Sequence, residues 1–171
     1  MEQQNPYRKS GMTMLVIAWA LGFALGYWFF NGWEQRQYNP NPQARLQKQS
    51  GELTLQRNRE GHYVAEGEIN GARVTFLLDT GATQVALPAS VARRLDLKPG
   101  QAIALGTANG RAIGYETRLA SVRLGPIEMG NVSAVITAGM QGDTVLLGMS
   151  FLKRLEFTQR EDRLILKQSA R

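Results

Sequence analysis

The sequence has no cysteine and a single histidine, His62. Without cysteine the chain forms no disulfide, no thiolate metal site and no cysteine nucleophile. Serine–histidine catalysis and zinc sites both need imidazole in a set arrangement, so one histidine in the polar stretch "REGHYVAEGEI" is better explained as a surface residue. We therefore expect no metal and no cofactor, and carboxylates remain as the side chains best suited to catalysis.

Long runs of positive charge are also missing, although the 171-residue chain has a formal charge of +6. Residues 1–50 carry 5 Lys or Arg against 2 Asp or Glu, and the remainder carries 15 against 12. No run of Lys or Arg exceeds two residues, so the concentrated basic footprint of a nucleic-acid-binding protein is absent from the sequence. The positive balance indicates solvated surface and is compatible with a position near anionic lipid.

One long apolar stretch is present, "MTMLVIAWALGFALGYWFF" at 12–30, and it has no charged residue. It is long enough to cross a bilayer as a helix. Tyr27, Trp28 and Trp33 cluster at its far end, where amphipathic rings suit the lipid–water boundary. A secretory signal peptide is the alternative, but its apolar core is usually shorter and no A-x-A-like cleavage site follows. We predict an N-terminal tail at 1–11 and a transmembrane anchor at 12–30.

Two features of this stretch bear on orientation and assembly. Arg8 and Lys9 precede it, which favours a cytoplasmic N-terminus and places the rest of a single-pass inner membrane protein in the periplasm. Three basic residues that lie farther out on the other side partly offset this bias. Gly22 and Gly26 form a G-x-x-x-G motif that lets two helices approach closely and dimerise, although glycine is also simply common in membrane helices.

Residues 31–50 are rich in Asn, Gln and Pro and lack apolar periodicity, so we predict a linker there. From 51 to 171 short apolar or alternating segments predict strands, and Asn-Gly pairs at 70–71 and 109–110 predict hairpin turns. Short helices are expected at 89–97 and 151–155. At least eight strands with so little helix predict a compact all-β domain.

The stretch "FLLDTGAT" at 76–83 places Asp79 directly after a buried strand. A carboxylate there is costly unless it is hydrogen-bonded or paired. Gly81 permits a tight backbone approach and exposes amide N–H groups. A strand-ending Asp that satisfies its own turn is the alternative explanation. Farther along, "TVLLGMSFL" ends a second buried strand at Gly148.

These segments resemble the retropepsin-like aspartic proteases, and specifically their membrane-anchored bacterial group. The resemblance is carried by "FLLDTGAT", by "TANG" at 107–110 and by "VLLGMSFL" at 145–152, and it covers roughly residues 52–168. It implies a barrel that corresponds to one half of a pepsin-type fold, with aspartic endopeptidase activity on peptide or protein substrates. It implies the following roles: Asp79 as the catalytic residue; Thr80, Gly81 and Ala82 as its support; Thr107, Ala108, Asn109 and Gly110 as the mobile flap; Leu147 and Gly148 as the late glycine motif.

Aspartic proteases need two facing aspartates that share one proton. This chain has one D-T-G, because Asp143 lacks the following glycine and Asp96 lies at the predicted end of a helix. The resemblance therefore implies a homodimer in which two Asp79 residues meet across a two-fold axis. A shared membrane would raise the local concentration of the two chains.

The sequence departs from the retroviral pattern at two places. Retroviral members carry an Asp after D-T-G-A that helps to hold the substrate backbone, and here Thr83 stands there. They also follow the late glycine with residues that brace the dimer, and here Met149 and Ser150 follow. A non-catalytic dimeric module that binds an extended peptide is therefore the second hypothesis. A structural membrane tether is the third.

Overall fold

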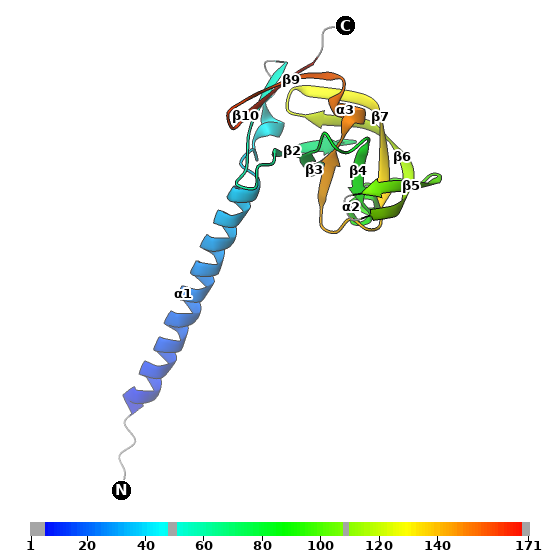
Figure 1. Ribbon diagram of the computed structural model, residues 1–171. Coiled ribbons are helices and arrows are strands. Elements are labelled where there is room, and N and C mark those ends of the chain that lie inside the picture. The colour runs from blue at the N-terminus through cyan, green and yellow to red at the C-terminus, as the bar shows by residue number, and fades with distance from the viewer. Residues whose placement is uncertain (1–5, 48–50, 108–109, 169–171) are drawn as a thin grey trace. The chain divides into compact units, whose positions relative to one another are not determined.

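The computed structural model describes residues 6–47, 51–107 and 110–168 (Figure 1). The chain divides into two compact units, with the boundary between Gln37 and Tyr38. Each unit is described by itself.

The first unit is the long helix α1, Pro6–Tyr38. Its stretch Gly11–Tyr38 has a mean hydropathy of 1.7 and is long and apolar enough to cross a membrane by length and composition. About 20 helical residues span the hydrocarbon core of a bilayer. The predicted apolar helix at 12–30 is therefore present, while the assignment of membrane span over signal sequence stays a prediction.

The segment predicted as a linker, 31–50, differs from that expectation in two ways. Helix α1 continues through its first part to Tyr38, and the 3₁₀ helix η1, Ala44–Leu46, follows. Ala44 is buried in the core of the second unit, and Asn41 forms a β-bridge with Ala65. The Asn, Gln and Pro content of 31–50 suggested an irregular segment. Composition is a local signal, and it could not show the order of these residues because the contacts that order them come from distant parts of the chain.

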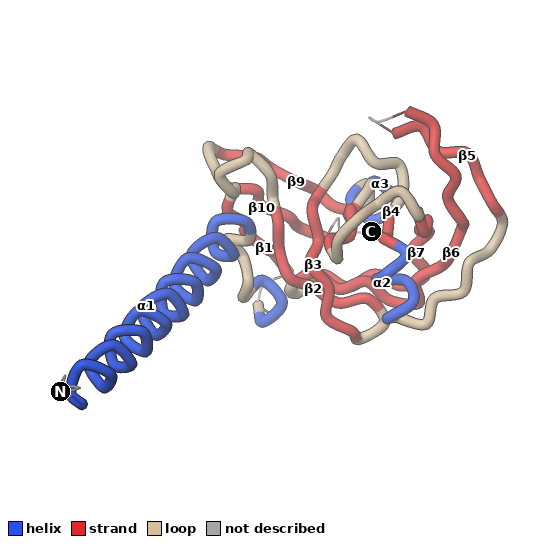
Figure 2. The backbone as a smooth tube through the Cα atoms, turned by 90° about the horizontal axis from the view of Figure 1, so that it is seen from below, coloured by secondary structure: helices blue, strands red, loops and turns tan. Residues whose placement is uncertain are grey.

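The second unit consists of two sheets (Figures 1 and 2). One sheet has seven strands in the order β2-β3-β8-β4-β7-β6-β5, and an additional β2–β6 pairing closes most of it into a barrel. The other has three strands in the order β1-β10-β9. The strands are β1 Glu52–Gln56, β2 Val64–Ile69, β3 Ala72–Leu78, β4 Val85–Pro88, β5 Ala102–Thr107, β6 Gly110–Leu124, β7 Ile127–Thr137, β8 Thr144–Leu147, β9 Leu155–Arg160 and β10 Arg163–Gln168.

The first Asn-Gly hairpin is confirmed in detail. Asn70 and Gly71 have φ angles of 50° and 79° and join β2 to β3. Positive φ at both central residues is the requirement of a type I′ turn, whose twist matches that of the flanking strands. The strand pair β5–β6 is also present at the second predicted hairpin, with Thr107 opposite Gly110. Ala108 and Asn109, its predicted turn residues, lie outside the described residues.

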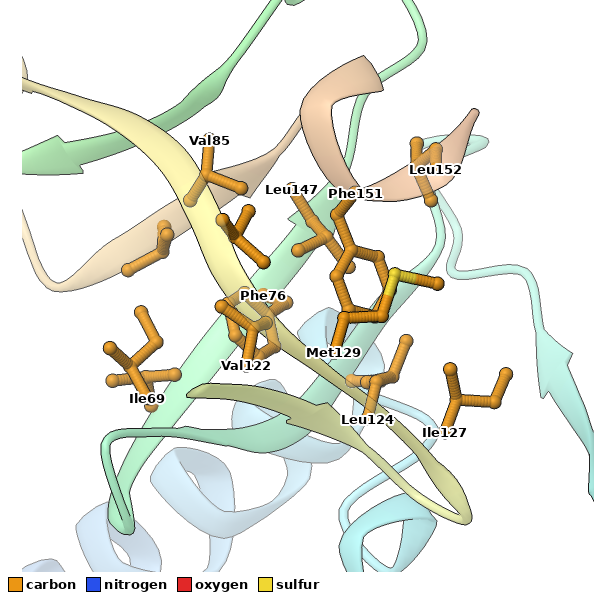
Figure 3. Close-up of a cluster of buried hydrophobic side chains, with 14 of the residues drawn as sticks. Ile69, Phe76, Val85, Val122, Leu124, Ile127, Met129, Leu147, Phe151 and Leu152 are labelled. Carbon is orange, nitrogen blue, oxygen red and sulfur yellow. The ribbon is translucent and has the colours of Figure 1, made fainter. Parts of the chain in front are cut away.

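The core of the second unit is filled by side chains from both sheets (Figure 3). Phe76 of β3, Leu147 of β8 and Phe151 are fully buried and lie in one cluster. Leu53 and Leu166 add apolar side chains from the three-stranded sheet. Burial of side chains of this size is worth about 1.5–3 kcal/mol each, so this cluster stabilises the pairing of β3 with β8.

Two short helices complete the unit, as expected. Helix α2, Ala89–Arg94, follows β4 and buries Val91 and Ala92. Helix α3, Met149–Leu152, starts two residues earlier than the predicted turn at 151–155. It starts earlier because the amide groups of Phe151 and Leu152 both donate to the Gly148 carbonyl, at 3.1 Å. Gly148, which follows the last residue of β8, therefore also caps the start of α3. The predicted all-β fold class with one or two short helices is confirmed.

Candidate functional site

Asp79 lies directly beyond the end of β3, where β3 runs parallel to β8. Leu78 is paired with Leu147, and the Asp79 amide donates to the Leu147 carbonyl at 3.2 Å. Two apolar strands, far apart in the sequence, thus end side by side at this acid. The Asp79 side chain is half-buried.

The turn after Asp79 holds one oxygen of its carboxylate. The Gly81 amide donates to Asp79 Oδ1 at 2.8 Å, and the Ala82 amide donates to the Asp79 carbonyl at 3.3 Å. This is the Asx-type turn that the sequence offered as an alternative explanation of the motif. Because the turn also fixes the carboxylate in one orientation, the Asx-type turn does not exclude a functional role for Asp79. Thr80 and Gly81 are exposed.

Gly148 lies against the loop that follows Asp79. The Met149 amide donates to the Ala82 carbonyl at 2.8 Å, and the Ser150 amide donates to the Thr83 carbonyl at 3.0 Å. A Cβ on Gly148 would lie 2.2 Å from the Gln84 carbonyl oxygen and 2.6 Å from that of Ala82. These are fixed backbone atoms, so the crossing requires a residue without a side chain. The structure thus brings Leu147 and Gly148 next to the Asp79 loop.

Ser150 braces the same crossing, a role that the sequence did not reveal. Its hydroxyl accepts a hydrogen bond from the Val85 amide at 3.0 Å and donates to the Ser133 carbonyl at 2.7 Å. The side chain therefore links α3 to both β4 and β7. The one signal in the sequence was the position of Ser150, two residues after Gly148. Retroviral members carry residues that brace the dimer directly after this glycine.

The predicted flap is the hairpin β5–β6, which extends to one side of the unit in both views, away from the three-stranded sheet (Figures 1 and 2). Of its predicted residues, Thr107 and Gly110 are described: the Thr107 hydroxyl donates to the Gly110 carbonyl at 2.8 Å. Gly114 is buried, and a Cβ there would lie 2.5 Å from both Leu105 Cδ1 and Val135 Cγ2. Gly114 therefore serves close packing at the base of the hairpin.

The remaining predicted residues lie apart from this site. Gly22 and Gly26 are on α1, four residues apart and so on one face. Apart from the backbone of the helix itself, no atom of the described residues lies within 4 Å of a Cβ built on either glycine. His62 is exposed, with its Nδ1 3.6 Å from a carboxylate oxygen of Glu60. Among the described residues, no group of three or more His, Cys, Asp or Glu is arranged to hold a metal ion.

With this geometry in place, the chain can be compared with known proteins. Residues 65–154, slightly more than half of the chain, match the protein family described as "gag-polyprotein putative aspartyl protease". The chain belongs to this aspartic protease family. The matched residues run from β2 to the end of α3, so they contain both the Asp79 turn and the Gly148 crossing.

Individual relatives agree with this assignment. A solved structure of a retropepsin-like aspartic protease from Rickettsia conorii is 35% identical, covers 67% of this chain and 89% of that chain, and superimposes with a TM-score of 0.57. An uncharacterized protein in the cobV 5′ region of Sinorhizobium sp. is 37% identical over 120 residues, which are 68% of this chain and 52% of that protein. The uncharacterized protein RP867 of Rickettsia prowazekii is 33% identical over 129 residues, 73% of this chain and 55% of that protein.

These matches confirm the resemblance and the fold that it implied. The second unit of the aspartic protease chain has the retropepsin-like fold, with the D-T-G turn and the late glycine side by side. The chain spans about half the length of the curated relatives that it matches.

Proposed function

We propose that the protein is an aspartic endopeptidase whose active site contains two Asp79 residues, one from each of two copies of the chain. The observation that carries this proposal is the fixed, half-buried carboxylate of Asp79 at the joined ends of β3 and β8. Family membership supports the reaction class, and the geometry supports the choice of residue.

In the proposed reaction the two Asp79 carboxyls share one proton, because two adjacent carboxylates do not both ionise easily. The ionised carboxyl takes a proton from a bound water, and the water oxygen attacks the peptide carbonyl carbon. The protonated carboxyl donates its proton to the developing oxyanion, which gives a gem-diol. As the gem-diol collapses, the carboxyl that took the water proton donates it to the leaving amine, and the other carboxyl recovers a proton from a gem-diol hydroxyl. Because one carboxyl of the pair must keep its proton, activity is expected at acidic to mildly acidic pH.

A second copy is needed because the chain supplies one acid in this setting. Asp143 is exposed, in the loop before β8. Asp96 is exposed just after α2, with a φ of 51°. Neither follows a buried strand with a Thr-Gly turn. A two-fold axis near Asp79 would provide the second carboxyl from an identical chain.

The roles of the neighbouring residues follow from their positions. Gly81 orients the Asp79 carboxylate, and Thr80 and Ala82 complete its turn. Leu147 and Gly148 lie against the loop that follows Asp79. Thr107 and Gly110 lie at the described end of the predicted flap. Closure of this flap over an extended peptide would exclude water from the reacting bond. The exposed side chains of Ile113 and Tyr115 on β6 offer apolar surface to such a peptide.

Helix α1 is proposed to anchor the protease in the inner membrane. Its apolar length supports a single span, and Arg8 and Lys9 favour a cytoplasmic N-terminus with the protease unit in the periplasm. Gly22 and Gly26 on one face would allow two such helices to pack. If the helix is instead a signal sequence, it will be absent from the mature protein, which N-terminal sequencing of protein from membranes would reveal.

A non-catalytic peptide-binding module is the second candidate. It is favoured by Thr83, which is exposed where retroviral members carry an Asp that holds the substrate backbone. Peptide binding without turnover across a broad pH range would support the module and exclude the protease.

The test of the protease is Asp79→Asn in the full chain. This substitution keeps the shape of the side chain but removes the titratable carboxyl. We expect cleavage of an unfolded protein substrate to fall by a factor of about 10² to 10⁴, with thermal unfolding near that of the unsubstituted chain. Asp143→Asn, at an exposed acid outside the turn, is the matched control and should retain full activity. Cleavage by purified Asp79→Asn protein at the original rate would falsify the proposal.

A further inference from the structure

Tyr38 is both the last residue of α1 and the first residue of the second unit. Its backbone carbonyl accepts a hydrogen bond from Asn58 Nδ2 at 3.1 Å, and its hydroxyl lies 2.9 Å from that of Thr144 at the start of β8. Asn58 is only 7% exposed, and its Oδ1 accepts from the amides of Glu60 and His62 at 3.0 and 2.8 Å. A buried side-chain amide whose two ends are both occupied is costly to release. The residue that ends α1 therefore belongs to the folded second unit.

The residues that follow Tyr38 are held as firmly, and we call residues 38–46 the strap. The Asn41 side chain makes three hydrogen bonds to the backbone of β1 and β2. Ala44 is buried in the core, and Arg45 forms an ion pair with Glu68 at 3.2 Å. These contacts recur every three or four residues, so the strap has no stretch that is free to extend.

The strap leaves no flexible linker between α1 and the second unit, as far as the described residues 6–47 show. The charge-free apolar stretch ends at Phe30, and α1 continues as a helix to Tyr38. A helix rises 1.5 Å per residue, so Tyr38 lies about 12 Å beyond Phe30 along its axis. The headgroup region of a bilayer is about 5–8 Å thick on each side. In the anchored protein, the second unit therefore begins within about 12 Å of the hydrocarbon.

The size of the second unit then limits the height of the candidate site. A compact unit as long as Tyr38–Arg171 has a radius of gyration of about 14 Å, which corresponds to a diameter of about 36 Å. Asp79 belongs to this unit, so it lies within about 36 Å of Tyr38 in every orientation of the unit. Together with the end of α1, this places the candidate site within about 50 Å of the hydrocarbon.

This limit sorts substrates by where they are held. A polypeptide anchored in the same bilayer shares a thin layer of solution with the protease, so its effective concentration at the site is high. A flexible segment close to the bilayer can enter the site, whereas a segment that a rigid domain holds much farther out cannot. A soluble polypeptide gains no such concentration.

We propose that the substrates are polypeptides anchored in the same membrane, and that the protease cuts them at extended segments within about 50 Å of the bilayer. The strap sets this limit. The inference rests on the proposed function, both for peptide cleavage and for the membrane anchor, and it adds the class of substrate.

Reporters of different height test this limit in vesicles that also contain the full-length protein. Each reporter has one apolar membrane helix, a rigid helical spacer, and a disordered segment of denatured casein that the full chain cleaves in detergent. Spacers of about 20 and about 60 residues hold the casein segment about 30 and about 90 Å from the bilayer. We expect the near reporter to be cleaved at least about tenfold faster than the far one.

An insertion shows whether the strap causes the difference. A flexible Gly-Ser linker of about 40 residues between Gln37 and Tyr38 allows the second unit to move far from the bilayer. This variant should cleave the near and far reporters at rates within about threefold of each other, because its reach now covers both. The same linker added after Arg171 is the matched control and should leave the preference for the near reporter unchanged. Both variants should cleave the free casein segment in detergent as fast as the unsubstituted chain.

The outcomes separate this inference from the proposed function. Equal cleavage of the two reporters by the unsubstituted chain overturns the inference, and so does a far reporter that stays intact after the insertion at Gln37. Active protease that is recovered without α1 from the soluble fraction also overturns it. In each of these cases, cleavage of the free casein segment leaves the protease standing. A chain that does not cleave this segment at any pH contradicts the proposed function, and with it this inference.

Discussion

The seven-stranded sheet is closed by its additional β2–β6 pairing, whereas the three-stranded sheet stops at the exposed strand β9. Around Asp79 the closed sheet joins the ends of β3, β4 and β8, and Gly148 lies in backbone contact with the loop between them. At β9 the open sheet exposes an aromatic side chain to solvent. The two sheets therefore differ in kind: the closed sheet holds Asp79 in a fixed turn, and the three-stranded sheet leaves β9 exposed.

This comparison makes separable predictions. A change in the crossing under Asp79 should lower both stability and activity and should have the largest effect on stability. A change at the joint between the two sheets should lower stability by a smaller amount. The predictions below run from the largest expected effect to the smallest.

Gly148→Val should have the largest effect on stability. The added side chain would meet two backbone carbonyl oxygens at 2.2 and 2.6 Å, and neither can move without shifting the Asp79 loop. Overpacking of this kind costs about 3 kcal/mol or more. We expect a much lower unfolding temperature for the full chain in detergent and loss of peptide cleavage. Gly139→Ala is the control, because its nearest neighbour to a Cβ is Thr137 Oγ1 at 4.0 Å. An unfolding temperature for Gly148→Val equal to that of the unsubstituted chain would contradict a rigid crossing at Gly148.

Asn41→Ala tests the joint between the sheets. The buried Asn41 amide donates to the carbonyls of Gln56 and Val64, both at 2.8 Å, and its Oδ1 accepts from the Gln56 amide at 2.7 Å. The side chain thus joins β1 of one sheet to β2 of the other. Its removal leaves buried groups without partners, at about 2–3 kcal/mol in the free energy of unfolding. Chemical denaturation would measure this loss, with the exposed Gln43→Ala as control. Equal stability of the two variants would contradict the assignment of 39–47 to the second unit.

Ser150→Ala should have the smallest effect. It removes the acceptor for the Val85 amide and the donor to the Ser133 carbonyl. The expected loss is about 1–2 kcal/mol of unfolding free energy, with self-association unchanged. Ser90→Ala, whose hydroxyl makes one exposed hydrogen bond to the Gly142 carbonyl, is the control. A loss of dimerisation without a loss of stability would show that Ser150 braces the dimer and not its own chain.

The sequence predicted much of the fold because most of its signals are local. The strand predicted directly before Asp79 is present as β3, Ala72–Leu78, and the Asn70–Gly71 turn has the backbone angles that its residues favour. The D-T-G turn was likewise visible, since its hydrogen bonds lie within four residues.

What the sequence could not provide depends on contacts between distant segments. Asn41 is one asparagine in a polar stretch, and nothing near it shows that two strands need its amide. Ser150 was noticed as a departure from the family pattern, but its partners lie on β4 and β7. Strands β9 and β10 lie in the region where the sequence predicts strands, yet alternation alone does not tell which strand forms the edge of a sheet.

The most direct test of the central claim is a mixing experiment. Unsubstituted and Asp79→Asn chains are mixed in detergent at a fixed total concentration, and peptide cleavage is measured against the fraction of unsubstituted chain. If each active site needs one Asp79 from each of two copies, cleavage falls as the square of that fraction, to about a quarter in an equal mixture. Cleavage that falls in simple proportion, with about half remaining, would mean that one chain acts alone and would contradict the account.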